Sequence, residues 1–127
     1  MIKANELRVG NHLFKYGEVV KIVEIGIKHK GDTNYYLRSE NDNCGYWIDQ
    51  FNPIPLTEEI LLKCGFEKRS DGDYNLFKYS EVDIIICNDF SSWQCDGINF
   101  SVNRIKYIHQ LQNLYWCLVG KELNFEL

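Results

Sequence analysis

The sequence predicts an α+β protein made of two consecutive halves, and three observations support this. Residues 1–55 carry short runs of β-branched and aromatic residues separated by turn residues. Residues 56–127 begin and end with helical patterns that enclose several strand patterns. Pro53 and Pro55 mark the only plausible linker, which is short and stiff. We therefore expect a small antiparallel β-barrel half at 1–55 and a helix–sheet–helix half at 56–127, packed as one compact unit.

In the first half, each expected strand is bounded by a turn or a polar loop. Strand patterns cover residues 12–16, 18–27, 35–38 and 46–51, and breaks occur at Gly17 and over residues 31–34 and 41–45. Many short strands with tight turns favour a small closed barrel, because closure removes exposed sheet edges. The spacing resembles that of SH3-like barrels, a likeness of layout alone.

The second half opens with signals for a short helix. Thr57 is placed as an N-cap, Glu58 and Glu59 complement the positive end of the helix, and Gly65 is placed to stop it. Strand patterns follow at 66–69, 74–79, 82–87 and 98–102, with a hairpin turn at 71–73 and a turn-rich segment around Trp93. Both helices can cover one face of this sheet.

The closing helix, expected over residues 104–120, is amphipathic. At about 100° per residue, one face collects Ile108, Leu111, Tyr115, Leu118 and Val119. The other side collects His109, Gln112, Asn113, Trp116 and Cys117. The sheet that covers the apolar face cannot also cover Trp116. We expect Trp116 to rest on the barrel half, on a second copy of the chain or on a partner.

Composition limits the class of protein. A hydrophobic share of 45% and an aromatic share of 14% are sufficient for a folded core. No apolar run has the length of a membrane span and no secretion signal opens the chain, so we expect a cytoplasmic protein. The net charge of −4 comes from residues 57–127, with seven basic and eleven acidic side chains. Phosphate binding needs clustered cations, and one patch could serve: Lys15, Lys21, Lys28, Lys30 and Arg38.

The sequence carries no catalytic or metal-binding signature. The five cysteines are odd in number and lack ligand spacing, so we expect reduced thiols and no zinc site, although Cys87 and Cys95 could face each other across a hairpin. His109 and Cys117 lie about 12 Å apart along a helix, beyond the reach of a nucleophile and its base. We predict no catalytic residue, no metal ligand and no cofactor.

Aromatic and amide side chains outside the expected core are the candidate contact residues. Adjacent residues of a strand point to opposite faces, so one of Tyr35 and Tyr36 and one of Tyr46 and Trp47 should face outward. Packing in the core and between the halves is the leading explanation of these aromatics, and an aromatic groove for an extended peptide or a base is the alternative. Six residues are the candidates for partner binding: Tyr36, Trp47, Trp93, His109, Gln112 and Trp116.

Three blocks of the chain resemble one family. Residues 5–11 (NELRVGN), 53–66 (PIPLTEEILLKCGF) and 106–115 (KYIHQLQNLY) look like a family of short uncharacterised proteins of bacterial and bacteriophage genomes. The resemblance spans nearly the full length, and it implies a compact domain and a phage or prophage origin. It supplies no activity and no catalytic residue.

Four functions remain in competition. The first is a non-catalytic module that binds an unidentified protein or forms a homodimer. The second is a phage-type inhibitor of a host defence or regulatory enzyme, which the acidic second half would suit. The third is an RNA- or DNA-binding barrel that uses the first-half lysines, with Tyr36 or Trp47 as a stacking platform. The fourth is an enzyme of unrecognised type.

Overall fold

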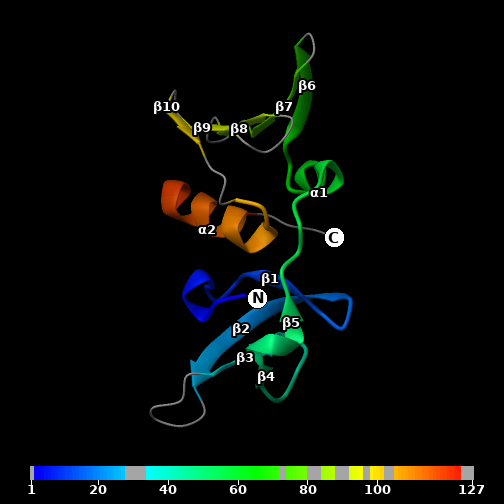
Figure 1. The fold of residues 1–127 in the computed structure, drawn as a ribbon, viewed down its shortest axis with the longest axis vertical. Helices are drawn as coiled ribbons and strands as arrows, with labels where there is room; N and C mark the ends of the chain where they lie inside the picture. The colour runs from blue at the N-terminus through cyan, green and yellow to red at the C-terminus, as the bar shows by residue number, and fades with distance from the viewer. Residues whose placement is uncertain are drawn as a thin grey trace. The chain divides into compact units, whose positions relative to one another are not determined.

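The computed structural model describes residues 2–27, 34–71, 74–79, 84–87, 92–95, 98–101 and 105–123. Within residues 69–101 it describes the backbone alone, and elsewhere in these ranges it also describes the side chains. The chain forms two compact units. Unit 1 comprises Met1–Pro55 and Tyr107–Asn113, and unit 2 comprises Leu56–Lys106 and Leu114–Leu127. The closing helix is therefore divided between the units, whereas the sequence placed all of it in the second half. The protein has an α+β fold (Figure 1).

Unit 1 is built on a five-stranded antiparallel sheet in the order β4-β3-β2-β1-β5. A short 3₁₀ helix precedes the sheet, and a second one lies between its last two strands. The elements are η1 (Ala4–Glu6), β1 (His12–Lys15), β2 (Glu18–Ile27), β3 (Tyr35–Ser39), β4 (Tyr46–Trp47), η2 (Ile48–Gln50) and β5 (Phe51–Asn52).

The sheet of unit 1 is open, so the prediction of a closed barrel is wrong. β4 and β5 form its two edges, and no pairing joins them among the described strands. Each of these strands has only two residues, and η2 connects them directly. They offer too few backbone groups to close the sheet, and very short edge strands also protect an open sheet from pairing with other chains.

The inner face of this sheet carries the core of unit 1. Leu13, Ile22 and Leu37 are fully buried, and Ile2 and Phe51 complete the cluster. The outer face is left for polar and aromatic side chains. Such a division is typical of an antiparallel sheet with one covered face.

A two-residue turn joins β1 to β2. Tyr16 and Gly17 occupy it with φ of 52° and 80°, and Lys15 pairs with Glu18 on either side. Positive φ at both central residues is characteristic of a type I′ turn, whose twist matches that of the flanking strands. The break predicted at Gly17 is therefore a tight hairpin.

Unit 2 contains a short helix and a second five-stranded antiparallel sheet, in the order β10-β9-β8-β7-β6. The strands are β6 (Glu67–Asp71), β7 (Tyr74–Tyr79), β8 (Ile84–Cys87), β9 (Ser92–Cys95) and β10 (Ile98–Ser101). The helix α1 (Glu58–Lys63) confirms the predicted cap, because the Thr57 hydroxyl accepts a hydrogen bond from the Ile60 N–H at 3.2 Å. Gly65 follows the helix with φ of 96°, as the stop signal predicted.

Two expectations for the second sheet are wrong. Trp93 lies in strand β9, paired with Phe100 and Ile86, and not in a turn. The β8–β9 register pairs Cys95 with Ile84, which lies three residues from Cys87. Three residues of a strand span about 10 Å. This separation exceeds the reach of a disulfide, about 7 Å between Cα atoms.

The closing helix α2 covers Ile108–Val119. Its first turns belong to unit 1, and at the helix start Gln110 Oε1 accepts a hydrogen bond from the Tyr107 N–H at 3.2 Å. Ile108 and Leu111 are fully buried, as expected, but Leu118 is exposed. The apolar face predicted at the end of the helix is therefore shorter in the structure. Among the described residues, no helix has both the length and the apolar character needed to span a membrane.

Candidate functional site

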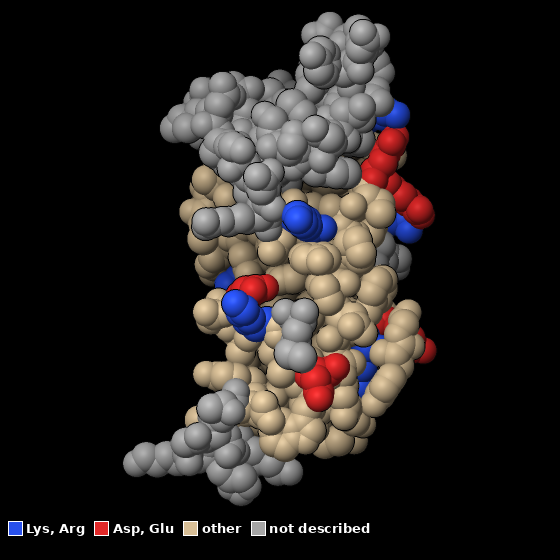
Figure 2. Space-filling view, in the orientation of Figure 1, with Lys and Arg blue, Asp and Glu red and all other residues tan. Residues whose placement is uncertain are grey.

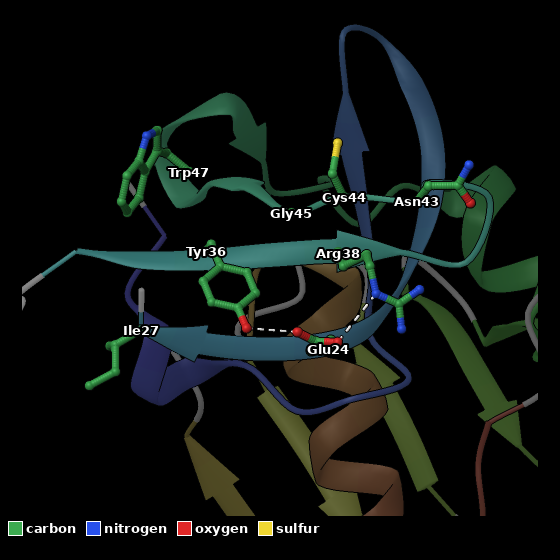
Figure 3. Close-up of a pocket in the computed structure, with 8 residues that line it drawn as sticks. All are labelled: Glu24, Ile27, Tyr36, Arg38, Asn43, Cys44, Gly45 and Trp47. Atoms are coloured by element: carbon green, nitrogen blue, oxygen red, sulfur yellow. Dashed lines mark hydrogen bonds and ion pairs between the residues drawn. The ribbon is translucent and has the colours of Figure 1, made fainter. Parts of the chain in front are cut away.

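A pocket of about 500 Å³ opens on the outer face of strands β2, β3 and β4 (Figure 3). Two aromatic side chains, one ion pair and a short turn surround it. Its lining consists of Glu24, Ile27, Tyr36, Arg38, Asn43, Cys44, Gly45 and Trp47. Two of these residues, Tyr36 and Trp47, were predicted as contact residues from the sequence.

The register of the sheet places these side chains together. Tyr36 is the cross-strand partner of Gly26 on β2 and of Trp47 on β4, and Glu24 is the partner of Arg38. Directly opposed residues of an antiparallel pair share one face of the sheet. The three neighbouring strands thus contribute one continuous outer surface.

A bulge in β2 directs Glu24 to this surface. Ile22 pairs with the buried Ser39, so strict alternation would also turn Glu24 inward. The register shifts between Ile22 and Glu24, and Glu24 then pairs with Arg38 on the outer face. One extra residue in a strand reverses the facing of the residues that follow it, and such bulges often serve to re-aim a side chain.

Two glycines make room for the Tyr36 ring. A methyl group added at Gly26 would lie 2.9 Å from the ring and its hydroxyl, and one at Gly45 would collide with the other end of the ring. The ring therefore lies close over the backbone of β2 and of the chain just before β4. The Tyr36 hydroxyl donates a hydrogen bond of 2.7 Å to Glu24 Oε1. Contacts at both ends hold the ring in one position.

Among the described residues of the pocket, one side chain is negatively charged, Glu24, and one is positively charged, Arg38, and the two are paired. Arg38 Nε donates to Glu24 Oε2 at 3.3 Å, and Arg38 Nη1 donates to the Asp42 carbonyl at 3.4 Å. Hydrogen bonds from Tyr36 and Arg38 lower the pKa of Glu24, and the bond to Glu24 raises the pKa of Tyr36. Glu24 is therefore ionised, and Tyr36 is neutral, at physiological pH.

Trp47 and Ile27 form one end of the pocket, and Asn43 lies toward the other end (Figure 3). Trp47 is 38% exposed and Ile27 is 44% exposed. Large apolar side chains at the mouth of a pocket are available to a partner without any rearrangement.

A second polar cluster lies in the same unit. It includes Lys15, one of the lysines of the predicted basic patch. Lys15 Nζ contacts Asp42 Oδ2 at 2.5 Å and lies 3.4 Å from the centroid of the Tyr46 ring. Ser39 donates to the same carboxylate oxygen at 2.6 Å. Burial acts to lower the pKa of Lys15, but the bond and the charge of Asp42 outweigh it, so the pKa is raised. Lys15 is thus a structural cation.

Gln112 is buried, although it was expected on the polar side of the helix. Its side chain is 1% exposed and joins α2 to the segment before β1. Gln112 Oε1 accepts from the His12 N–H at 2.8 Å, and its Nε2 lies 2.8 Å from His12 Nδ1. The neighbouring Asn113 bonds both Asn11 and the Glu6 carbonyl at 2.8 Å. These amides hold the helix within unit 1.

His109 is fully buried beside this network. Its ring stacks on Tyr107, with 5.9 Å between centroids, and neither ring nitrogen has a hydrogen-bond partner among the described residues. The Glu6 carboxylate lies 3.7 Å from Nε2, and this nearby charge favours the protonated ring. Burial outweighs that attraction and lowers the pKa of His109. In this conformation His109 and Gln112 present no surface to a partner.

The remaining candidates fall outside the pocket. Trp116 lies on α2 and is 41% exposed. Coverage by a second copy or a partner remains a prediction for this residue. Trp93 has a described backbone, in β9, while its side chain lies outside the described part of the chain.

Sequence reasoning missed six of the eight lining residues as site residues, and it also missed Gly26, which makes room for the Tyr36 ring. The six are Glu24, Ile27, Arg38, Asn43, Cys44 and Gly45. One signal was available. A glycine inside a strand, such as Gly26, often marks a bulge or a close approach by another group. The bulge in β2 could not be predicted from the alternation of polar and apolar residues, because its position depends on how β2 pairs with β3.

Cysteine and metal chemistry add little to this site. Cys44, Cys64 and Cys117 are free thiols, and burial raises the pKa of Cys64 to about 12. A thiol with that pKa is unreactive at neutral pH. In the part of the chain that the structure describes, no three His, Cys, Asp or Glu residues gather as metal ligands.

Comparison with protein-family models finds no match, and comparisons with curated proteins and with solved structures find none either.

Proposed function

We propose that this protein is a non-catalytic interaction module whose binding surface is the pocket on β2, β3 and β4. One observation carries the proposal: Tyr36 is fixed by two glycines and Glu24, and the half-exposed Trp47 and Ile27 stand beside it. A rigid aromatic side chain in a pocket is a typical anchor for protein partners, because little conformational freedom is lost on binding.

The pocket chemistry favours binding over catalysis. Glu24 is the only carboxylate among the described lining residues, and it already accepts hydrogen bonds from Tyr36 and Arg38. Among the described residues that line the pocket there is no histidine to serve as a base for the Cys44 thiol, and His29 lies outside the described part of the chain. A nucleophile or general base needs a partner within hydrogen-bond reach.

Nucleic-acid binding by unit 1 receives less support. Within the predicted basic patch, Lys15 and Arg38 are paired with Asp42 and Glu24, and Lys28 and Lys30 lie outside the described residues. Figure 2 shows Lys and Arg beside Asp and Glu, with no broad area of one sign among the coloured residues of this face. Phosphate backbones require several cations that are free to approach them.

The phage-type inhibitor is a special case of the same proposal, in which the partner is a host enzyme. It rests on the resemblance of the three sequence blocks to bacterial and bacteriophage proteins. An SH3-like topology without closure of the sheet remains a proposal for unit 1, and the pairing of β5 with β1 supports it.

Affinity capture from lysates of the source cells tests the proposal with three variants. We expect the wild-type protein to retain a specific partner and Trp47→Ala to reduce its recovery at least tenfold. Tyr16→Ala is the matched control, because Tyr16 is 73% exposed and does not line the pocket. Tyr16→Ala should leave recovery unchanged. Loss of the partner from Trp116→Ala but not from Trp47→Ala would move the binding surface to α2 and overturn the proposal.

A further inference from the structure

We propose that the pocket takes an uncharged aromatic or aliphatic side chain, presented by an extended segment of a partner protein. This inference rests on the proposed function and names the chemistry of the ligand. The charge, the shape and the rigidity of the lining residues support it.

Charge comes first. The described lining residues include one carboxylate, Glu24, and one guanidinium, Arg38, and these two groups bind each other. A guanidinium or ammonium group of a ligand would approach Glu24 but also meet Arg38. A phosphate or carboxylate would approach Arg38 but also meet Glu24. Like charges at close range oppose binding, so charge complementarity favours a neutral ligand.

Shape selects an apolar group. Trp47 and Tyr36 supply the aromatic lining, and Trp47 is 38% exposed, while Ile27 pairs with Tyr35 and borders the pocket only at the end of β2. A volume of about 500 Å³ falls within the usual range of ligand pockets, about 300–1,000 Å³. The pocket is open on one side, so a side chain can enter while its backbone stays extended across the mouth.

A nucleobase is also neutral and aromatic, but it is attached to phosphate. Arg38 is the only cation among the described lining residues, and it is already paired with Glu24. The nearby Lys15 has only 10% of its side chain exposed and contacts Asp42. A nucleotide would therefore leave its phosphate without a free cation, and a protein segment is the better occupant.

Rigidity supports the same occupant. The bulge after Ile22 places Glu24 on the outer face, and Gly26 and Gly45 admit the Tyr36 ring. The pocket wall is formed before any ligand arrives. A preformed apolar wall recognises a side chain mainly by shape and apolar contact, because no residue has to be ordered during binding.

NMR titration of the full chain tests the ligand class with N-acetyl amino acid amides as probes. We expect the tryptophan and leucine derivatives, at millimolar concentration, to shift the Trp47 indole and the Gly45 amide signals in a saturable way. The arginine and glutamate derivatives should bind at least fivefold more weakly. Adenosine and AMP complete the series. Tighter binding of AMP than of adenosine, a preference for either charged amide, or no shift with any neutral amide would each overturn the inference.

Two variants separate apolar contact from polar recognition. Trp47→Ala should abolish the shifts of Gly45, whereas Tyr36→Phe should retain affinity within twofold, because it keeps the ring and removes only the bond to Glu24. A large loss with Tyr36→Phe in a folded protein would contradict recognition by apolar contact. If capture of a cellular partner depends on Trp47 while the amide series prefers a charged group, the proposed function stands and the ligand class is wrong.

Discussion

At the scale of single residues, the position of a side chain in this protein depends on its neighbours more than on its own preference. Glu24 follows a strand pattern that would turn it inward with Ile22, and a bulge turns it outward. Gly26 and Gly45 contribute no side chain, yet both are needed for the Tyr36 ring to lie where it does. The site is therefore a product of pairing between strands.

Gly17 provides a test of backbone strain alone. Its φ is 80°, and a Cβ built there meets nothing within 4 Å. Gly17→Ala should therefore lower the free energy of unfolding by about 1–2 kcal/mol, through the left-handed backbone conformation rather than a clash. Urea denaturation measures the change. Gly17→Asn should cost less, since asparagine tolerates this conformation. Equal stability of Gly17→Ala and the parent would contradict the type I′ turn.

His109 should make stability depend on pH. Burial lowers its pKa in the folded protein below the ordinary value of 6.5. On acidification the unfolded chain takes up the proton first, so stability falls as the pH drops through about 6.5 and stops falling below the folded pKa. The stability advantage of the wild type over His109→Gln should therefore shrink with acid. Urea titrations at several pH values measure this difference, and a constant difference would contradict the prediction.

At the scale of elements, the start and end of a helix were easier to predict from the sequence than the residues that pack around it. The cap at Thr57 and the stop at Gly65 are local features, and both are confirmed. The helical projection of α2 placed Gln112 and His109 on a polar side, but it could not show that the chain before β1 covers that side. Trp93 was mistaken for a turn residue because its neighbours are turn formers, whereas β9 gains its pairing from β8 and β10.

Gln112 tests how α2 is held in unit 1. Gln112→Ala removes the acceptor of the His12 N–H and leaves that donor without this side-chain partner. We expect the free energy of unfolding to fall by about 1–3 kcal/mol, the usual cost of a buried polar group that loses its partner. Cys117→Ala, on the exposed side of the same helix, is the control and should change stability by less than about 0.5 kcal/mol. Equal effects of the two substitutions would argue against the amide network.

At the scale of the whole molecule, the division of the chain differs from a simple split at the linker. A boundary between the halves was predicted around Pro55 because the sequence changes there from strand patterns to a helical pattern. No local pattern could show that residues 107–113 return to unit 1, since this depends on contacts between segments about one hundred residues apart. The expectation that the two halves pack as one compact unit remains a prediction.

Truncation tests whether the first half can fold alone. Residues 1–56 retain the β1–β5 sheet but lack the part of α2 that belongs to unit 1, including the fully buried Ile108 and Leu111. Burial of each such side chain contributes about 1.5–3 kcal/mol. Their joint loss is comparable with the whole stability of a small domain, about 5 kcal/mol at the low end. We therefore expect the fragment to give collapsed amide spectra and no cooperative thermal transition.

The matched control restores the missing segment. A synthetic peptide of residues 104–120, added to the fragment in excess, should recover dispersed amide signals because it returns Ile108, Leu111 and Gln112 to unit 1. Recovery should be weaker with the Gln112→Ala peptide, since that peptide lacks the acceptor for the His12 N–H. A fragment that melts cooperatively without any peptide would show that the sheet is stable alone. In that case the return of α2 would serve to connect the two units rather than to complete the first.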